Sequence, residues 1–268
     1  MARNLVGALM SAASGDAVVL RDITLAYNGR PAVCHVSGSF ARGSLTAIVG
    51  PNGSGKSTLL KGIVGLLRPT EGFIAYPQSA SSGIAYLPQH IEIDRRFPIS
   101  VIDTVLLGLW RRIGWARPVS GRLRQAARQA IATVWLEGLE QRPVETLSAG
   151  QFQRVLFARL IVQDADLILL DEPFSAIDWR TSDDLLRLIA NWHQAGRTVP
   201  AVLHDLDQIR AYFPNSLLLA RKCIAWGATR EVLSPHNLRR AREMSGSWPA
   251  EPANDEPIPP RAYLPVSQ

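Results

Sequence analysis

A glycine-rich segment that begins at residue 50 has the residue types and spacing of a phosphate-binding loop. Residues 50–58 read Gly-Pro-Asn-Gly-Ser-Gly-Lys-Ser-Thr and complete the pattern G-x-x-x-x-G-K-[ST]. In such a loop the glycines let backbone N–H groups turn toward phosphate oxygens, where a side chain would block them. The expected contacts are spread over the whole segment: Gly50, Pro51, Asn52, Gly53, Ser54, Gly55, Lys56, Ser57 and Thr58. We expect Lys56 to reach the β and γ phosphates and Ser57 to ligate Mg²⁺.

The residues on either side of this loop favour a binding role over a structural turn. Residues 44–49 are short, apolar and β-branched, which is typical of a buried strand. Residues 58–67 are apolar nearly all round and stop at Arg68-Pro69, which predicts a buried helix. The N-terminus of that helix would add partial positive charge beside the phosphates. Strand, loop and helix together predict a nucleoside-triphosphate site.

A phosphate loop alone lacks a second magnesium-side group and a base that activates water. Two adjacent carboxylates at the end of a second apolar run supply both. Residues 167–170 are Leu-Ile-Leu-Leu, which predicts a buried strand, and Asp171 and Glu172 follow directly. At the tip of such a strand we expect Asp171 to meet Mg²⁺ through a water molecule. We expect Glu172 to face the attacking water as a general base.

Residues 147–151 read Leu-Ser-Ala-Gly-Gln at the start of a predicted helix. This segment resembles the signature L-S-G-G-Q of the ABC ATPase superfamily, in which Ser148, Gly150 and Gln151 would contact a nucleotide. Further marks of that family follow in their usual order over about residues 17–235. The resemblance assigns roles to four more residues: Tyr27, Gln89, Asp178 and His204.

Each of these assignments has its own motif. Tyr27 resembles the aromatic that stacks on adenine, with an ordinary turn-packing aromatic as the alternative. Gln89, in Tyr-Leu-Pro-Gln, resembles the glutamine that links Mg²⁺ to a transmembrane partner, and a plain loop residue is the alternative. Asp178 lies in a segment, 175–178, that is similar to the loop crossing the dimer interface. His204 resembles the histidine that grips the γ-phosphate, and a satisfied core histidine is the alternative.

The resemblance implies a head-to-tail dimer with two ATP molecules at its interface. Lys56 and Ser57 of one copy would face Ser148 and Gly150 of the other across each nucleotide. Transmembrane permease subunits would follow the opening and closing of the dimer through a groove near Gln89. The implied catalytic residues are Glu172, His204, Lys56 and Gln89. The implied magnesium ligands are Ser57, Gln89 and Asp171.

Three positions depart from the family pattern. Ala149 replaces the second glycine of the signature, and Leu203 stands before the histidine where a small hydroxylated residue is more usual. Pro200 falls inside the predicted strand before His204, where a missing N–H is awkward unless it lies at the strand's start. None of these changes removes a catalytic group, so an active ATPase is still implied. We expect Ala149 to have a negative, helix-like φ.

The segment from residue 86 to residue 105 resembles the subfamily that serves zinc and manganese importers. It pairs Ile93-Asp94 with Phe97-Pro98 and a helix start of the form V-x-D, which favours zinc ahead of manganese. Importers of iron chelates or amino acids share parts of this pattern and stay open as alternatives. An extracytoplasmic metal-binding protein would take part only indirectly. Non-transport ABC ATPases that act on nucleic acid usually have two cassettes or a long coiled coil, so no nucleic acid partner is expected.

The remaining sequence predicts an α/β fold with a P-loop NTPase core. Residues 17–50 alternate apolar and polar around a turn at 27–31, which predicts an antiparallel β subdomain. A small α-helical subdomain is expected at about 95–147, with a capping box at Ser100. Alternating helices and strands after residue 150 imply a mostly parallel sheet. The predicted strands and helices in that part are 151–163, 167–170, 181–194, 198–203, 207–211 and 216–220.

Length and composition limit the possible domain organisation and cellular location of the protein. The ATPase domain is expected at 16–240, between a flexible N-terminus (1–15) and a Pro-rich disordered tail (245–268). A signal peptide is not expected, and no apolar run reaches the ~18 residues of a membrane span. With only Cys34 and Cys223, both in apolar segments, reduced thiols in a cytoplasmic protein are expected. The formal charge of +6 fits solvated helix faces, or a surface that meets anionic headgroups or the loops of a membrane partner. The family resemblance implies a peripheral protein on the cytoplasmic face of the inner membrane.

Overall fold

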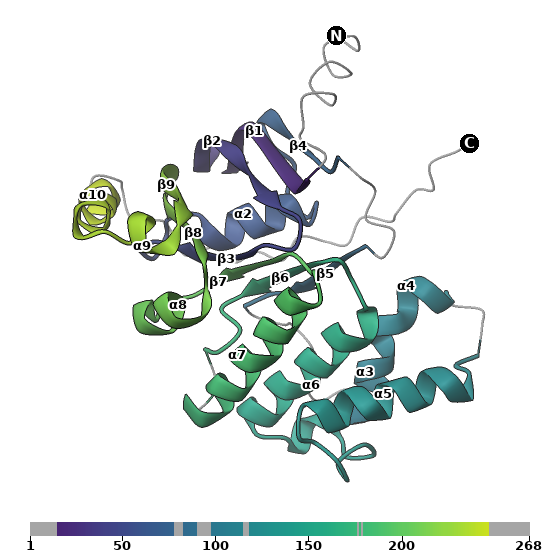
Figure 1. The fold of residues 1–268 in the computed structure, drawn as a ribbon. Coiled ribbons are helices and arrows are strands. Elements are labelled where there is room, and N and C mark those ends of the chain that lie inside the picture. The colour runs from purple at the N-terminus through teal and green to yellow at the C-terminus, as the bar shows by residue number, and fades with distance from the viewer. Residues whose placement is uncertain are drawn as a thin grey trace, which may run out of the picture.

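The computed structural model describes residues 15–77, 83–89, 98–114, 118–175, 177 and 179–246. Its strands form a six-stranded sheet and a three-stranded sheet, with helix α2 (Lys56–Ile63) between them (Figure 1). Leu59, Leu60 and Ile63 of α2 belong to the apolar core shared by the two sheets. The helix that follows the phosphate loop is therefore buried on nearly all sides, as its sequence predicts.

The six-stranded sheet carries the strands that end in chemically active residues. Its order is β5-β6-β7-β3-β8-β9, and the first five strands run parallel. Every residue of three of its inner strands is buried, which accounts for their unbroken apolar runs. The mostly parallel sheet is confirmed. Its strands are β5 (Ile84–Leu87), β6 (Leu167–Asp171), β7 (Val199–Val202), β3 (Leu45–Val49), β8 (Asn215–Ala220) and the antiparallel β9 (Lys222–Ala228).

The smaller sheet is antiparallel and has the order β2-β1-β4. Strands β1 (Asp16–Tyr27) and β2 (Arg30–Ala41) meet at the turn that the sequence predicts. Strand β4 (Glu71–Ala75) joins β1 rather than its sequence neighbour β5, which belongs to the larger sheet. The chain therefore passes from one sheet to the other between residues 75 and 84.

Helices cover the face of the larger sheet opposite α2 (Figure 1). Ser100 caps α3 by accepting a 3.2 Å hydrogen bond from the N–H of Asp103, as its sequence predicts. Helix α5 ends at Thr133 and is capped by Val134, because the next residue, Trp135, has a φ of 56° that is not helical. Helices α6 (Ala149–Gln163) and α7 (Trp179–Gln194) form this layer. Beyond it, α3 (Val101–Leu106), η1 (Leu107–Leu109) and α5 (Gly121–Thr133) pack on α6, and the short α4 (Trp110–Ile113) and η2 (Val144–Thr146) belong to the same part of the chain.

The C-terminal part contains elements that the sequence pattern did not predict. Strand β9 and the helices α9 (Thr229–Val232) and α10 (Pro235–Gly246) follow the expected α8 (Leu206–Tyr212) and β8. Helix α10 packs on β8 and β9, and it reaches into the stretch predicted as a disordered tail. The rest of that tail and residues 1–14 lie outside the described residues. Among the helices that are described, none has the length and apolar character needed to cross a membrane.

Pro200 is the second residue of β7, and its missing N–H falls at a break in the pairing with β6. Leu167 forms an isolated bridge with Thr198, and the ladder resumes only at Leu170 and Ala201. On the other side of β7, the N–H of Val199 donates to Ser44 of the segment before β3. Because alternate N–H groups point to opposite neighbours, position 200 faces β6. The pairing keeps the same register on both sides of this gap, so the gap is the place where the missing N–H of Pro200 leaves β7 without a hydrogen bond to β6.

Gly38 of β2 lies where the two sheets meet through Trp226 of β9. A Cβ at Gly38 would lie 2.5 Å from two ring atoms of Trp226, whose ring also packs 4.8 Å from that of Phe40. Gly38→Ala should therefore lower the free energy of unfolding by about 1–3 kcal/mol through overpacking, measured by urea denaturation. As a control, Gly121→Ala at the start of α5 meets nothing within 4 Å and should not destabilise. Equal stability of both variants would contradict this packing.

Candidate active site

The chemically active residues gather at the carboxyl ends of three neighbouring strands. The phosphate loop follows β3, Asp171 ends β6 and Glu172 comes next, and His204 lies just beyond β7. Because β6, β7 and β3 are adjacent and parallel, these ends meet at the same edge of the sheet. The carboxyl edge of an open parallel sheet is the usual place for a ligand.

The phosphate loop approaches its neighbours too closely for side chains at two glycines. A Cβ at Gly50 would lie 2.0 Å from the carbonyl oxygen of Leu219. A Cβ at Gly55 would lie 2.4 Å from the carbonyl oxygen of Ala32, and Gly55 has a φ of 90° at the N-cap of α2. Glycine is therefore required at both positions by sterics as well as by the phosphate-binding pattern.

Lys56 is buried beneath this loop. Its Nζ donates hydrogen bonds of 2.9 Å to the carbonyl oxygens of Gly50 and Pro51. Burial lowers the pKa of Lys56, while the nearby charges of Glu172 and Asp171 oppose that shift. The ammonium group thus lies at the loop, within reach of an anion held by its backbone N–H groups.

Ser57 and Asp171 form a pair of oxygen donors next to the loop. The Ser57 hydroxyl donates a 2.9 Å hydrogen bond to Oδ1 of Asp171, and the Tyr86 hydroxyl lies 3.4 Å from Oδ2. Burial raises the pKa of Asp171, and these hydrogen bonds oppose the shift. A hydroxyl and a carboxylate are hard oxygen ligands of the kind that Mg²⁺ prefers, so the two residues fit that ion. Tyr86 is a member of this cluster that the sequence did not single out.

The carboxylate of Glu172 is held by two side chains from distant parts of the chain. Nε2 of Gln89 donates a 2.8 Å hydrogen bond to Oε2, and Nε2 of His204 lies 2.7 Å from Oε1. The side chain of His204 is 47% exposed, which excludes the alternative of a core histidine, whereas that of Glu172 is only 17% exposed. Glu172 also has a φ of 48°, a strained backbone conformation that occurs often at functional sites.

The signature segment forms the N-terminus of α6. The Ser148 hydroxyl accepts a 3.2 Å hydrogen bond from the N–H of Gln151, and Oε1 of Gln151 accepts a 3.0 Å bond from the N–H of Ser148. Ala149 is the first residue of the helix and does not have a positive φ, so the expected helical conformation is confirmed. This helix start is exposed and presents free N–H groups to solvent.

One predicted residue, Tyr27, stands apart from this cluster. Tyr27 lies at the end of β1 and is 37% exposed, and the Nζ of Lys61 is 6.0 Å from its ring centroid. An exposed ring at this position can accept a stacking partner, so the assignment to adenine stays a prediction. Asp178 lies outside the described residues.

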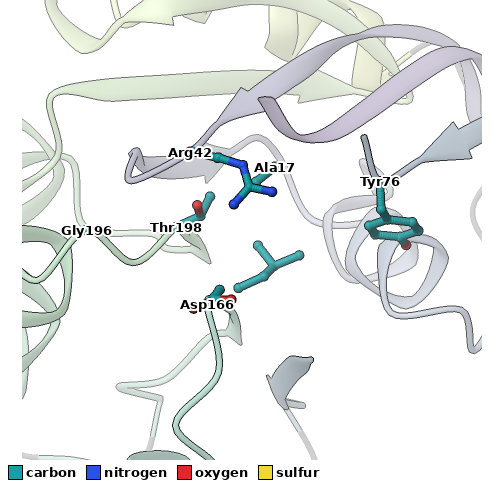
Figure 2. Close-up of a pocket in the computed structure, with 7 residues that line it drawn as sticks. Ala17, Arg42, Tyr76, Asp166, Gly196 and Thr198 are labelled. Carbon is teal, nitrogen blue, oxygen red and sulfur yellow. The ribbon is translucent and has the colours of Figure 1, made fainter. Parts of the chain in front are cut away.

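A separate pocket of about 170 Å³ lies at the opposite edge of the larger sheet. Figure 2 shows the side chains of Arg42, Thr198 and Asp166 around an open space, with Tyr76 on its far side. Asp166 and Thr198 immediately precede β6 and β7, so this pocket is at the amino ends of the strands. It shares no residue with the phosphate loop or the carboxylate cluster.

Three features on one parallel sheet define a P-loop nucleotide hydrolase. They are a phosphate loop, a pair of oxygen ligands suited to magnesium, and the carboxylate of Glu172 held by two side chains. Residues 33–175 match the model of the family described as ABC transporter. The chain belongs to this family. Its fold is that of an ABC ATPase, and its reaction is the hydrolysis of ATP.

Curated relatives cover most of the chain. It is 37% identical to the manganese transport system ATP-binding protein MntB of Listeria monocytogenes, over 83% of this chain and 94% of the relative. It is 39% identical to the zinc transport system ATP-binding protein TroB of Treponema pallidum, over 85% and 88%. Among solved structures, a metal-chelate type ABC transporter in an inward-facing conformation has a TM-score of 0.76 at 32% identity, over 85% of this chain and 89% of that one.

The geometry at the start of α6 predicts unequal effects at two neighbouring positions. Ala149→Gly replaces a helical residue by one that is less favourable in a helix by about 1 kcal/mol, so ATPase activity should change only a few-fold. Gly150→Asp should abolish activity, because it places a carboxylate at the helix terminus that the family resemblance turns toward the γ-phosphate of a second copy. Steady-state release of phosphate measures both. A large gain of ATPase activity in Ala149→Gly would contradict this prediction, because it would show that the alanine lowers the activity.

Proposed function

We propose that this chain is the ATPase subunit of an importer of divalent transition-metal ions, with zinc as the preferred cargo and manganese as the alternative. The observation that carries the ATPase part is the clamped carboxylate of Glu172 beside the phosphate loop. Support for the metal comes from the relatives at 37–39% identity, which are named for manganese or zinc transport. A metal-chelate importer is the second candidate, favoured by the solved structure at 32% identity.

ATP would lie with its phosphates in the loop at the end of β3. The backbone N–H groups of residues 50–58 and the N-terminus of α2 offer donors and partial positive charge to the phosphate oxygens. Lys56 would exchange its bonds to the Gly50 and Pro51 carbonyls for the β and γ phosphates. Tyr27 would stack on the adenine from the end of β1. Asp178 would contribute from the loop that meets a second copy.

Ser57, Asp171 and Gln89 are the proposed ligands of a magnesium ion. That ion, when bound, neutralises charge on the phosphate oxygens. Gln89 donates its amide N–H to Glu172, which leaves its amide oxygen as a ligand. One residue would thus connect the metal side of the site to the catalytic carboxylate.

Glu172 is the proposed general base. A water molecule attacks the γ-phosphorus while its proton passes to the carboxylate, and the bond between the β and γ phosphates breaks to leave ADP. Gln89 and His204 hold the two carboxylate oxygens, so the base is oriented before the water arrives. His204 would also bind the γ-phosphate through its exposed imidazole.

Two copies are proposed to close head to tail around two ATP molecules. Ser148, Gly150 and Gln151 of one copy would contact the γ-phosphate held by Lys56 and Ser57 of the other, which suits the exposed N-terminus of α6. An ATP held by both copies favours the closed dimer, and hydrolysis removes the shared anchor. Membrane permease subunits would convert this motion into transport, which places the chain at the cytoplasmic face of the membrane.

The proposed base makes a direct prediction. Glu172→Gln keeps the size of the side chain and an acceptor for Gln89, but the amide cannot take a proton. ATP should still bind and stabilise the dimer, while hydrolysis falls by the ~10²–10⁴-fold typical of a lost general base. Phosphate release and size-exclusion chromatography with ATP measure the two effects. Glu137→Gln, in the exposed loop after α5, is the matched control; turnover of Glu172→Gln near that of the control would reject the assignment.

The cargo is tested by growth. Cells that lack this chain should grow poorly when divalent metals are chelated, and zinc (or manganese) should restore growth because it bypasses the lost high-affinity uptake. Uptake of radioactive zinc and manganese in the same cells gives the rate directly. Complementation with the Glu172→Gln variant should fail, which ties uptake to ATP hydrolysis. Rescue by an iron chelate alone would favour the second candidate and contradict the first.

A further inference from the structure

The turn between β8 and β9 lies against the phosphate loop and against the start of β2 at the same time. The N–H of Arg221 donates a 2.9 Å hydrogen bond to the carbonyl oxygen of Ser54, inside the loop. The carbonyl oxygen of Arg221 accepts a 2.7 Å bond from the N–H of Cys34 in β2. A single peptide segment therefore joins two parts of the chain that are far apart in sequence.

The side chain of Arg221 adds a third connection. Its guanidinium donates a 3.1 Å hydrogen bond to the carbonyl oxygen of Pro31, the second residue of β2. Arg221 has a φ of 59°, a conformation that is unfavourable for a residue with a long side chain. The fold thus accepts a strained residue at a place where its backbone and side chain both reach neighbouring elements.

The start of β2 is the segment that sets the position of Tyr27. Tyr27 and Arg30 are partners in the β1–β2 pairing, with only a two-residue turn between them. Ala32, two residues further along β2, has the carbonyl oxygen against which Gly55 of the phosphate loop packs. The base-stacking residue and the phosphate loop therefore meet at the segment that Arg221 holds.

We propose that Arg221 is a positioning residue that fixes the distance between the adenine-stacking Tyr27 and the phosphate loop, and so sets the affinity for a whole nucleotide. A nucleotide must contact both regions at once, so looseness between them costs affinity even when each region stays intact. The guanidinium bond to Pro31 holds the adenine side, and the backbone bond to Ser54 holds the phosphate side. This inference rests on the role proposed for Tyr27.

The first test separates the side chain from the backbone. Arg221→Asn keeps the N–H and C=O groups and tolerates a positive φ, but its side chain is too short to reach Pro31. In the full-length chain, the Kd for Mg-ATP should rise about fivefold, the loss expected for one hydrogen bond. The Kd for inorganic tripolyphosphate should change by less than about twofold, because that ligand needs only the phosphate loop. Unchanged affinity for ATP, or an equal loss for both ligands, would overturn the proposal.

Two further variants keep the test decisive. Lys222→Asn removes the neighbouring exposed cation and should leave both affinities unchanged. Arg221→Lys retains a donor that can approach Pro31 and should show an intermediate loss for ATP alone, and it replaces the asparagine variant if that one does not fold. A loss of thermal stability in Arg221→Asn with ATP affinity unchanged would mean a purely structural role and would reject the inference.

A double-mutant cycle with Tyr27→Ala connects Arg221 to the base. If Arg221 acts through the position of Tyr27, adding Arg221→Asn to Tyr27→Ala should cost less than about twofold in ATP affinity. Full additivity would contradict the inference. If Tyr27→Ala alone leaves ATP affinity unchanged, the role proposed for Tyr27 fails, and this inference fails with it. If Tyr27→Ala weakens ATP binding and Arg221→Asn does not, only the present inference fails.

Discussion

The parallel pairing of β6, β7 and β3 is the constraint on which the site depends. Each strand ends at the same edge of the sheet, and each contributes one part of the chemistry: the phosphate loop, the two carboxylates and the histidine. More than 100 residues of sequence separate β3 from β6 and β7. Even so, the sheet pairs Val202 of β7 with Ile48 of β3 on one side and with Asp171 of β6 on the other. Because all three strands are buried, the alignment of their ends is fixed by the core rather than by the site itself.

The carboxylate of Glu172 shows what this rigid frame makes possible. The residue has a positive φ, which costs of order 1–3 kcal/mol and persists only where the surroundings determine it. Its N–H donates a 3.2 Å bond to the carbonyl oxygen of Val202, so the backbone is tied to β7 just where it leaves β6. With Gln89 on one oxygen and His204 on the other, the side chain is oriented from two separate loops. Strain, burial and polar contacts therefore meet at the residue that we propose as the general base.

The smaller sheet carries Tyr27, the residue proposed to stack on adenine, and the placement of this sheet relies on packing between layers. Helix α2 fills the space between the sheets, and Trp226 of β9 packs on Phe40 of β2. The phosphate loop is enclosed by these contacts, with Leu219 behind Gly50 and Ala32 behind Gly55. The loop is thus shaped by the strands on both sides of it, and its glycines are needed for close packing as much as for phosphate contact.

The sequence by itself determined the chemistry. Three local patterns carry it: the spacing of the phosphate loop, the two carboxylates after an apolar run, and the signature segment. A local pattern can be recognised in the sequence without knowledge of the fold. It also predicted most strands and helices, because buried strands and amphipathic helices have distinct periodicities. It places helix ends less well: the apolar pattern predicts that the helix after the phosphate loop runs to residue 67, but α2 ends at Ile63, and Gly65 has a φ of 83°.

Only the tertiary structure decided which distant residues meet. Nothing local indicates that Gln89 and His204 both contact Glu172, that Tyr86 approaches Asp171, or that β4 and β5 join different sheets. It is equally invisible in the sequence that the missing N–H of Pro200 faces β6 rather than β3. The sequence around Arg221 likewise gives no sign that this residue of a short turn contacts Ser54, Cys34 and Pro31. The reason is physical: contacts between strands depend on sheet order and register, which the whole core selects and no short segment encodes.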